Sequence, residues 1–426
     1  RGPSGPSERP CGPEMSARSV AVVGAGWAGL AAAVQATRDG HAVTLIEMAP
    51  APGGRARGVA VDGHQLDNGQ HILIGAYTET LALMRAVGAD PDALLLRRPL
   101  AIRYPDGSGL TLPPGPPMLA FALGVLGAAG WGWRERLALL RAAGGWLAAG
   151  FRADAATTVA QLCARLPARL RDNLLAPLCV AALNTPAEAA SAQVFLRVLH
   201  DALFAGRGSA DLLLPRASLS ALLPEPAWAW LQARGTTLRA GVRATDLARD
   251  GSRWRLDGEA FDAVILAASV RESARLAQPH APAWATQAAG FAYEPIVTVY
   301  LQADARLPLP MMALREGPQA PAQFAFDLGA LGLGPGVFAF VVSGARAWVA
   351  RGLPATAEAV LAQAHTALGT AFAPARVLHV AAEKRATFAC TPGLARPAAA
   401  IAPGLWAAGD YTEGPYPATL EGAVRS

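Results

Sequence analysis

Two short apolar runs near the start of the chain, residues 20–23 and 42–46, have the continuous hydrophobic pattern of strands that are buried on both faces. Between them, residues 31–38 repeat apolar positions at helical spacing, and Gly40 stands where such a helix would end. The order strand, helix, strand predicts a βαβ unit, in which the two strands lie parallel in one sheet. We therefore expect a doubly wound α/β domain in this part of the chain.

The rest of the chain alternates between strand-like and helical patterns in long blocks. A strand and turn at 235–247 and a hairpin that leads into a buried strand at 254–268 predict a return to the first sheet. Three further strand-like runs, at 295–301, 323–326 and 337–343, predict a separate antiparallel sheet. Helical repeats occupy residues 77–88, 134–149, 158–165, 169–182, 189–204 and 357–368. These blocks predict a second domain in which an antiparallel sheet carries a helical cap.

The turn after the first strand carries the first candidate chemistry. It reads Gly24-Ala25-Gly26-Trp27-Ala28-Gly29, which is the spacing of a dinucleotide-binding turn. Gly24 permits the tight turn, Gly26 lets a diphosphate approach the backbone, and Gly29 lets the helix pack closely on the strand. Glu47 ends the second strand 21 positions after Gly26, where its carboxylate can bind a ribose diol. The contacts predicted for the dinucleotide also include Ala25 and Ala28.

A second glycine-rich element, Gly53-Gly54-Arg55, follows this unit. A further close backbone approach and a guanidinium beside the first turn suit a diphosphate that is held from two sides. This order of elements resembles the FAD-binding start of flavin amine oxidases and carotenoid desaturases more than that of NAD dehydrogenases. The resemblance implies FAD as the cofactor. Cys390 does not match the pattern by which some amine oxidases attach their flavin, so we expect non-covalent FAD and a buried thiol.

Two longer stretches of sequence make the resemblance specific to one family. The first, Asp67-Asn68-Gly69-Gln70-His71, follows a hairpin with an Asp62-Gly63 turn, and the second runs from Tyr416 to Val424 as Tyr-Pro-Ala-Thr-Leu-Glu-Gly-Ala-Val. Both resemble the hydroxysqualene dehydroxylase family, the bacterial squalene-associated desaturases. The resemblance covers both ends of the chain and the return at 235–268, whereas the middle is similar only in general character.

The resemblance also implies positions around the flavin. Gly69 and Gln70 would pass beside the flavin ring, and the backbone of Val242 would face the adenine. Gly409 and Asp410 follow a buried strand, where the aspartate of such flavoproteins binds the ribityl chain. A helix predicted to begin at Pro417 would direct its N-terminal turn, with Ala418 and Thr419, at the pyrimidine edge of the flavin.

The reaction implied by the resemblance is the reductive removal of an allylic hydroxyl from hydroxysqualene, which gives squalene for hopanoid-type lipids. The candidate acids are His71 and Tyr416, because each stands beside a cofactor element. Two alternatives stay open. One is a related FAD enzyme that acts on a carotenoid or an amine. The other is a non-catalytic relative that binds prenyl lipids, and the intact glycine turn with Glu47 argues against it.

The discontinuous pattern sets the expected domain boundaries. The Gly/Pro/Ser/Arg-rich residues 1–14 show no periodicity, so we expect them to be disordered. The FAD-binding domain is expected to comprise residues 15–76, 205–275 and 375–426. The substrate domain is expected to comprise residues 77–204 and 276–374.

Composition adds a preference for a lipid substrate. Hydrophobic residues make up 52% of the 426 residues and charged residues only 16%, and residues 107–133 contain no charge. For residues 115–150 we weigh a buried cap helix against a face that enters one leaflet of a membrane, and we favour a combination in which the segment lines an apolar tunnel that opens at the bilayer. A membrane-spanning helix is disfavoured, because the apolar run is short and interrupted by glycine.

The distribution of basic residues and cysteines argues against several classes of function. No basic run is interleaved with aromatic residues, so a nucleic-acid partner is not expected. The four cysteines are scattered without Cys-x-x-Cys spacing, so neither a disulfide framework nor a metal site is supported, and a reducing compartment fits. We expect a cytoplasmic protein on the inner face of a bacterial plasma membrane, with a long isoprenoid substrate and squalene-pathway synthases as candidate partners.

Overall fold

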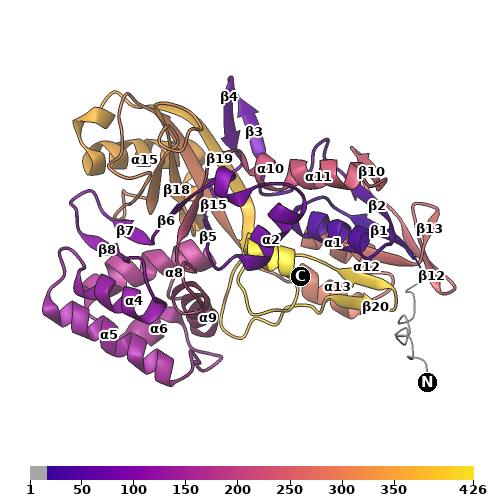
Figure 1. The fold of residues 1–426 in the computed structure, drawn as a ribbon, viewed down its shortest axis with the longest axis horizontal. Helices are drawn as coiled ribbons and strands as arrows, with labels where there is room; N and C mark the ends of the chain where they lie inside the picture. The colour runs from indigo at the N-terminus through magenta and orange to yellow at the C-terminus, as the bar shows by residue number, and fades with distance from the viewer. Residues whose placement is uncertain (1–16) are drawn as a thin grey trace, which may run out of the picture.

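The computed structural model describes residues 17–426 and shows a mixed α/β protein built on two main sheets (Figure 1). The expected disorder of residues 1–14 concerns a segment outside the described residues. The first sheet has six strands in the order β10-β2-β1-β14-β21-β20, and all its pairings are parallel except that of β20 with β21. Its strands are β1 (Ser19–Val23), β2 (Ala42–Glu47), β10 (Thr237–Ala240), β14 (Ala263–Leu266), β20 (Ala400–Ala402) and β21 (Leu405–Ala407).

The parallel sheet is buried on both faces, as the continuous apolar runs predict. Val20 and Val22 of β1 pack into the core under helix α1 (Trp27–Arg38), whereas Ala21 and Val23 face a second core on the opposite side. The strands of this sheet come from three separate stretches of sequence, since β14 pairs with β1 and β21 pairs with the other edge of β14. The predicted α/β class with a parallel-sheet core is therefore confirmed.

The second sheet is antiparallel, with strand order β16-β17-β18-β15-β19. Its strands are β15 (Tyr293–Gln302), β16 (Met311–Ala313), β17 (Phe324–Asp327), β18 (Val337–Val342) and β19 (Arg376–Phe388). Alternate residues of β15, such as Val297 and Val299, pack against helix α15 (Leu353–Leu368). The intervening side chains, including Thr298 and Tyr300, face the other way, towards the site described below.

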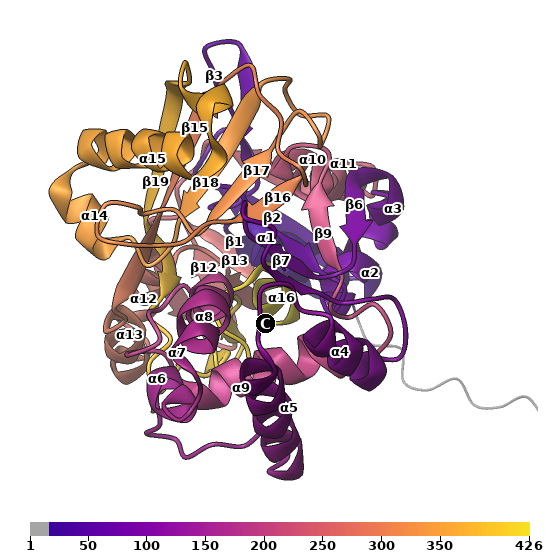
Figure 2. The same ribbon diagram turned by 90° about the vertical axis from the view of Figure 1, so that its left-hand side faces the viewer.

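A group of helices forms a cap beside the antiparallel sheet, as Figures 1 and 2 show. The cap comprises α4 (Pro117–Leu126), α5 (Trp133–Ala148), α6 (Val159–Cys163), α7 (Ala168–Leu170), a π-helical turn (Arg171–Leu175), α8 (Ala176–Leu183) and α9 (Ala192–Leu203), with the small hairpin β7 (Ala101–Arg103) and β8 (Gly109–Thr111). Within residues 17–426, no helix combines the length and the apolar character that crossing a bilayer requires.

The remaining elements are short. In chain order they are β3 (Gly58–Val61), β4 (His64–Asp67), β5 (Leu73–Ile74), α2 (Thr78–Ala86), α3 (Pro91–Leu94), β6 (Leu95–Arg98), β9 (Leu212–Pro215), α10 (Leu219–Leu222), α11 (Pro224–Gln232), β11 (Leu247–Asp250), β12 (Arg253–Leu256), β13 (Glu259–Phe261), α12 (Val270–Ala277), α13 (Pro282–Ala289), α14 (Arg346–Arg351), a 3₁₀ turn (Thr370–Phe372) and α16 (Leu420–Arg425).

The predicted domain boundaries stay a prediction, but two elements pack against the domain to which the prediction did not assign them. Strand β19 falls in the segment 375–426 assigned to FAD binding, yet it pairs with β15 in the antiparallel sheet. Helix α2 falls in the segment 77–204 assigned to the substrate domain, yet Leu81 and Met84 pack in the core that lies under α1. Long-range packing decides both placements, and local periodicity does not report it.

Candidate functional site

The glycine turn after β1 forms a cradle at the N-terminus of α1. Gly24 has φ +104°, and a Cβ there would lie 2.7 Å from the carbonyl oxygen of Ala267. A Cβ on Gly29 would lie 1.8 Å from the carbonyl oxygen of Gly24. The fold itself therefore requires these two glycines, for the turn and for the close approach of helix and strand.

Gly26 is different, because the protein does not need a glycine there. Its φ is −71°, and the nearest atom to an added Cβ would be the Cα of Gly54 at 4.0 Å. Among the described residues no side chain caps α1, so the first N–H groups of this 12-residue helix point at the space that Gly26 leaves open. The cradle fits a diphosphate, whose negative charge a helix N-terminus favours. Ala28 lies in this first turn.

The second glycine element packs directly on the first. Gly53 and Gly26 form a parallel bridge, and the Gly53 N–H donates to the carbonyl of Ala25 at 2.8 Å. A Cβ on Gly54 would lie 3.2 Å from the Cα of Gly26. The two glycine elements, whose bridged residues Gly26 and Gly53 stand 27 positions apart in sequence, therefore form one continuous surface, and we call this surface with the residues that contact it the groove.

Glu47 closes one end of this groove. Its carboxylate accepts the N–H of Ala25 at 2.6 Å and the N–H of Ala49 at 2.8 Å, which fixes it beside the glycine turn. Val242 donates its N–H to the Glu47 carbonyl at 2.9 Å, so only its carbonyl stays available for an adenine. The side chains of Met48 and Val242 are 59% and 42% exposed, and they give this end an apolar surface that suits a flat base.

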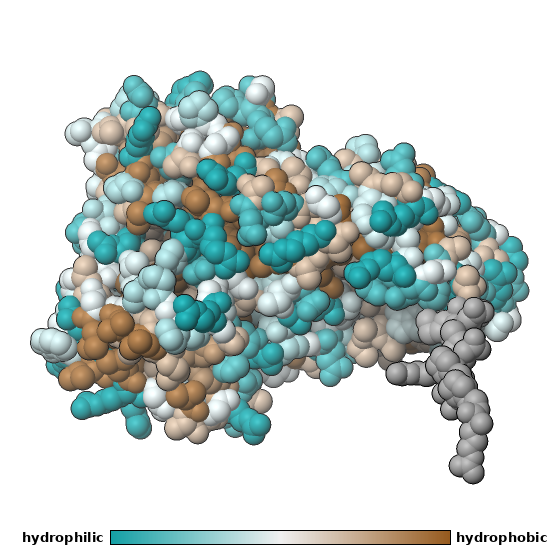
Figure 3. Space-filling model, viewed as in Figure 1, coloured by the Kyte–Doolittle hydropathy of each residue, from teal (hydrophilic) through white to brown (hydrophobic). Residues whose placement is uncertain are grey.

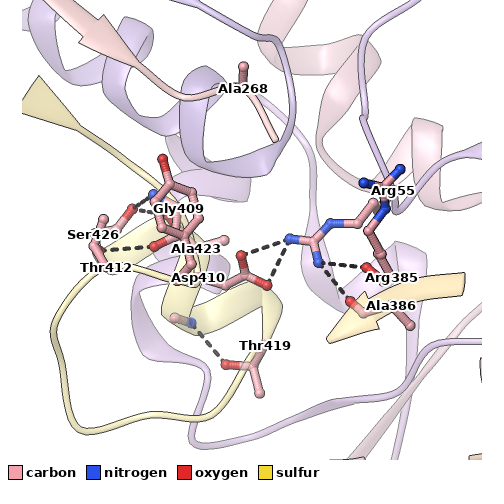
Figure 4. Close-up of polar contacts among 12 residues, drawn as sticks. Arg55, Ala268, Arg385, Ala386, Gly409, Asp410, Thr412, Thr419, Ala423 and Ser426 are labelled. Atoms are coloured by element: carbon pink, nitrogen blue, oxygen red, sulfur yellow. Dashed lines mark hydrogen bonds and ion pairs between the residues drawn. The ribbon is translucent and has the colours of Figure 1, made fainter. Parts of the chain in front are cut away.

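Arg55 joins the groove to the C-terminal part of the chain. Its guanidinium donates two bonds to the Asp410 carboxylate, at 2.7 and 2.8 Å, and one to the carbonyl of Ala386 at 2.7 Å (Figure 4). The Asp410 charge raises the pKa of Arg55. The sequence placed Arg55 against a diphosphate, whereas here its charge is matched by Asp410, so the pair presents no net charge to the groove.

The segment after β21 differs from its prediction. Gly409 donates its N–H to the Ser426 hydroxyl at 2.8 Å, and Thr419 caps helix α16 by accepting the Gly422 N–H at 3.0 Å. Helix α16 begins at Leu420, so the prediction that it begins at Pro417 is wrong. Thr419 takes an extended conformation with φ −137° and supplies the cap, which places the helix start after it. Ala418 lies in the preceding loop.

Strand β4 leads into the string from Asp67 to His71. The Gln70 N–H donates to the hydroxyl of Thr298 on β15 at 3.4 Å, and Gly69 lies beside the same hydroxyl. The His71 Nδ1 bonds to the Gly69 carbonyl at 2.8 Å and therefore carries the proton in this arrangement. Burial lowers the pKa of His71, and the nearby Arg55 charge lowers it further. His71 is thus a neutral imidazole at pH 7, with its Nε2 lone pair free to accept a hydrogen bond.

Tyr416 lies in a different environment from His71. Its hydroxyl accepts a bond from Arg197 of α9 at 3.3 Å, and two guanidinium groups lie close to its ring, with the Cζ atoms of Arg197 and Arg425 at 5.3 and 5.5 Å from the ring centre. These contacts tie the cap helix α9 to α16. The structure brings Glu47, Gly26, Gly54, Arg55 and Asp410 together along one groove, but it places Tyr416 among arginines at the edge of the cap.

The groove also contains a residue that the sequence analysis missed. Tyr293, at the start of β15, lies near the charges of both Arg55 and Asp410, and burial raises the pKa of its hydroxyl to about 12. A lone tyrosine in a strand-like run carries no sequence signal for such a place. Cys390 is 3% exposed, and burial raises the pKa of its thiol to about 12, so it is a buried thiol as predicted.

Asp67 gives a testable pH effect. Its carboxyl accepts the Leu219 N–H at 2.9 Å, and burial raises its pKa from 3.8 to about 7. The folded protein therefore binds a proton that the unfolded chain has released, so stability falls as the pH rises from about 4 to about 7. We expect Asp67→Asn to remove this loss and to unfold at a higher temperature than the wild type at pH 8. The exposed Asp304→Asn is the control, and equal pH slopes for Asp67→Asn and the wild type would contradict the expectation.

Comparisons with known proteins agree with this geometry. The model of the family described as flavin containing amine oxidoreductase matches residues 27–426. The hydroxysqualene dehydroxylase of Rhodopseudomonas palustris is 28% identical and aligns over 96% of both chains. The hydroxyneurosporene desaturase of Rhodobacter capsulatus is 41% identical over 101 residues, which are 23% of this chain and 20% of the relative.

The fold itself is found among solved structures. An oxidoreductase from Methanosarcina mazei superposes with a TM-score of 0.71 at 15% identity, over 95% of this chain and 98% of that one. The family match begins at Trp27, inside the glycine turn, and continues through Glu47, the Asp67 string and the C-terminal segment, which contribute to the groove. The chain therefore belongs to the flavin containing amine oxidoreductase family and is an FAD-dependent oxidoreductase.

Proposed function

We propose that this enzyme reduces hydroxysqualene to squalene. The observation that carries the proposal is the similarity to the hydroxysqualene dehydroxylase of Rhodopseudomonas palustris, which extends over 96% of both chains and thus includes the cap as well as the cofactor groove. The reaction replaces one C–O bond with a C–H bond and releases water, so it consumes two electrons and two protons. When bound, reduced FAD supplies the hydride.

We propose that FAD is held non-covalently by the residues that line the groove. The amides at the start of α1 would receive the diphosphate, and Glu47 would receive the adenosine ribose. Arg55 and Asp410 would hold the middle of the cofactor as a neutral pair. The contacts proposed for the cofactor are those of Gly24, Ala25, Gly26, Ala28, Gly29, Glu47, Gly53, Gly54, Arg55, Gly69, Gln70, Val242, Gly409, Asp410, Ala418 and Thr419.

The cap supports a hydrocarbon substrate. Leucine, isoleucine, alanine and aromatic side chains from β7, β8, α4, α5, α8 and α9 surround a cavity of about 30 Å³, and among the described residues all of its lining is apolar. That volume is about the space of one water molecule, so an isoprenoid chain must move these side chains apart to enter. A dry lining protects an allylic cation from recapture by water, which the proposed reaction requires.

His71 is our first candidate for handling the proton. Neutral at pH 7, it can accept the substrate O–H at Nε2 and orient the C–O bond, whereas its protonated form can donate to the departing oxygen. Tyr416 is the second candidate, but its bond to Arg197 favours a positioning role between the cap and α16. Both assignments are proposals.

A pH profile tests His71. Because its pKa lies below 6.5, the protonated form becomes populated only as the pH falls, and we expect kcat to rise from pH 8 towards pH 6. His71→Gln should flatten this rise and lower kcat by roughly tenfold to a hundredfold while the protein keeps its FAD. Tyr416→Phe should change kcat by less than about threefold. A wild-type slope that persists in His71→Gln would exclude His71 as the group that titrates.

The substrate is tested with purified protein under two conditions. Hydroxysqualene is given to the reduced enzyme without oxygen and with excess reductant, whereas the carotenoid and the amine are given to the oxidised enzyme with an electron acceptor such as oxygen or a quinone, because their oxidation transfers two electrons to the flavin. Hydroxysqualene, a carotenoid precursor such as phytoene and a primary amine are incubated separately, and the products are separated by chromatography. We expect squalene from the first and no product from the other two. Desaturation of the carotenoid would favour the second candidate, which the desaturase match over 23% of this chain supports. A colourless protein without product would indicate a lipid-binding relative.

The location of the enzyme is part of the same proposal. A long isoprenoid dissolves in lipid and not in water, so we propose peripheral contact with the inner face of a bacterial plasma membrane through residues 115–150. Squalene-pathway synthases would supply the substrate there.

A further inference from the structure

Exposed apolar side chains concentrate on α4 and α5. Of the eleven large hydrophobic side chains that are exposed in residues 17–426, seven lie on these two helices, and two of the other four, Met48 and Val242, lie at the adenine end of the groove. We call the seven the docking surface; they are Met118, Leu119, Leu123, Leu126, Trp133, Leu137 and Leu147. Figure 3 shows the hydrophobic patch over α4 and α5, and Figure 2 shows α5 at the extreme end of the molecule.

Helix α4 is apolar on both of its faces. Phe121 and Val125 point inward and are buried in the core, whereas Leu119 and Leu123 point outward and are 53% and 49% exposed. A surface helix of a protein that stays in water normally carries polar residues on its outer face. A helix that is hydrophobic all round needs an apolar partner on its second side.

The rim of the docking surface is basic. Residues 107–152 contain four arginines and a single acid, Glu135. Arg134 and Arg141 are both exposed on α5, Arg134 next to Trp133 in sequence and Arg141 about two turns further along. Trp133 is 65% exposed, and its ring centre lies 5.1 Å from the guanidinium carbon of Arg136. Tryptophan and arginine at the border of an apolar face are typical of helices that lie in the headgroup region of a membrane.

We propose that the docking surface binds the surface of an anionic lipid bilayer, with α4 and α5 lying in the interface. The exposed leucines would enter the acyl region, and Arg134 and Arg141 would pair with lipid phosphates. A second copy of the chain fits the surface less well. In a two-fold dimer through this face the arginine rims would meet each other, and like charges across an interface oppose association.

The position of the surface also supplies a route for substrate, and this step rests on the proposed function. Phe121 of α4 and Leu139 and Ala143 of α5 line the apolar cavity of the cap from inside. A single layer of helix therefore separates the docking surface from the cavity. Displacement of α4 in the interface would connect the cavity to the acyl region, so the isoprenoid would enter without crossing water.

Vesicle flotation of the full-length flavoprotein tests the surface. Vesicles of phosphatidylglycerol mixed with phosphatidylcholine are compared with vesicles of phosphatidylcholine alone. We expect wild-type protein to bind the anionic vesicles at least about tenfold more tightly, and Arg134→Glu/Arg141→Glu to abolish this preference. Leu119→Ser/Leu123→Ser should weaken binding to the anionic vesicles by about tenfold or more.

Control variants outside the docking surface show whether a loss of vesicle binding is specific to that surface. Arg38→Glu/Arg85→Glu changes the net charge equally on exposed arginines elsewhere, and Val377→Ser removes an exposed apolar residue from β19, so both should bind like the wild type. All variants should keep their FAD absorption, which shows that they fold.

Three results would overturn the proposal: wild-type protein that binds neither vesicle, leucine variants that bind like the wild type, or a dimer in sedimentation that Leu119→Ser/Leu123→Ser dissociates. Vesicle binding needs no turnover, so its result is independent of the substrate assay. Vesicle binding by an enzyme that does not act on hydroxysqualene would leave the surface correct and the proposed substrate wrong.

Discussion

Gly26→Val is expected to give a folded protein that has lost FAD. The backbone at Gly26 has φ −71° and ψ 179°, which valine adopts, and the nearest atom to an added Cβ is 4.0 Å away. The side chain would project into the space at the N-terminus of α1 that we assign to the diphosphate. We expect the FAD Kd to rise at least about a hundredfold, which corresponds to about 3 kcal/mol. Titration of apoprotein with FAD, followed by flavin fluorescence, measures it.

Two other glycines provide the comparison. Gly144 on α5 meets no atom within 4 Å of an added Cβ, so Gly144→Val should bind FAD like the wild type. Gly29→Ala should fail to fold, because its Cβ would lie 1.8 Å from the Gly24 carbonyl oxygen. Gly26→Val that melts like wild-type apoprotein and binds FAD with unchanged affinity would show that the diphosphate lies elsewhere.

Asp410→Asn is expected to weaken FAD binding by about tenfold to a hundredfold. The carboxylate accepts two bonds from Arg55, and its side chain is only 10% exposed. Asparagine cannot offer two charged oxygens to Arg55, so the pair that we propose to hold the middle of the cofactor loses its fixed geometry, and a hydrogen bond to a charged group is worth about 1.5–3 kcal/mol. Isothermal titration of apoprotein with FAD gives the affinity, and the double variant Arg55→Met/Asp410→Asn gives the coupling between the two residues.

The exposed pair of Arg255 and Asp250 is the control. Arg255 donates a bond to the Asp250 carboxylate at 2.7 Å on the hairpin of β11 and β12. Asp250→Asn should leave the FAD affinity unchanged, because exposed ion pairs contribute little and this one has no part in the proposed cofactor site. An Asp410→Asn variant with wild-type affinity would mean that the pair of Arg55 and Asp410 only ties the domains together.

The glycine turn and Glu47 were predictable because their requirements are local. A tight turn, a helix start and a strand end lie within 29 residues, so spacing alone reports which atoms will meet. Gly53 follows Glu47 after a loop of five residues, so its contact with Gly26 is also a contact between neighbouring parts of the sequence. The geometry brings these residues together, and their contacts with FAD stay a prediction.

Contacts between residues that lie far apart in the sequence could not be predicted from the local pattern of residues. Arg55 and Asp410 are 355 positions apart, and no local signal shows that their charges neutralise each other. Tyr293 reads as an ordinary strand residue, and Tyr416 reads as part of a cofactor string although its ring lies close to Arg197 and Arg425. The tertiary contacts that decide these three cases form only when both sheets and the cap are assembled.

We propose that a groove built from both ends of the chain holds FAD beside a cap that receives hydroxysqualene. A single-turnover experiment tests it most directly. The protein is reduced in the absence of oxygen and mixed with limiting hydroxysqualene, while the visible absorption of the flavin and the amount of squalene are measured in the same sample. We expect each squalene formed to restore the absorption of one oxidised flavin. Flavin that stays reduced while hydroxysqualene is recovered unchanged would contradict it.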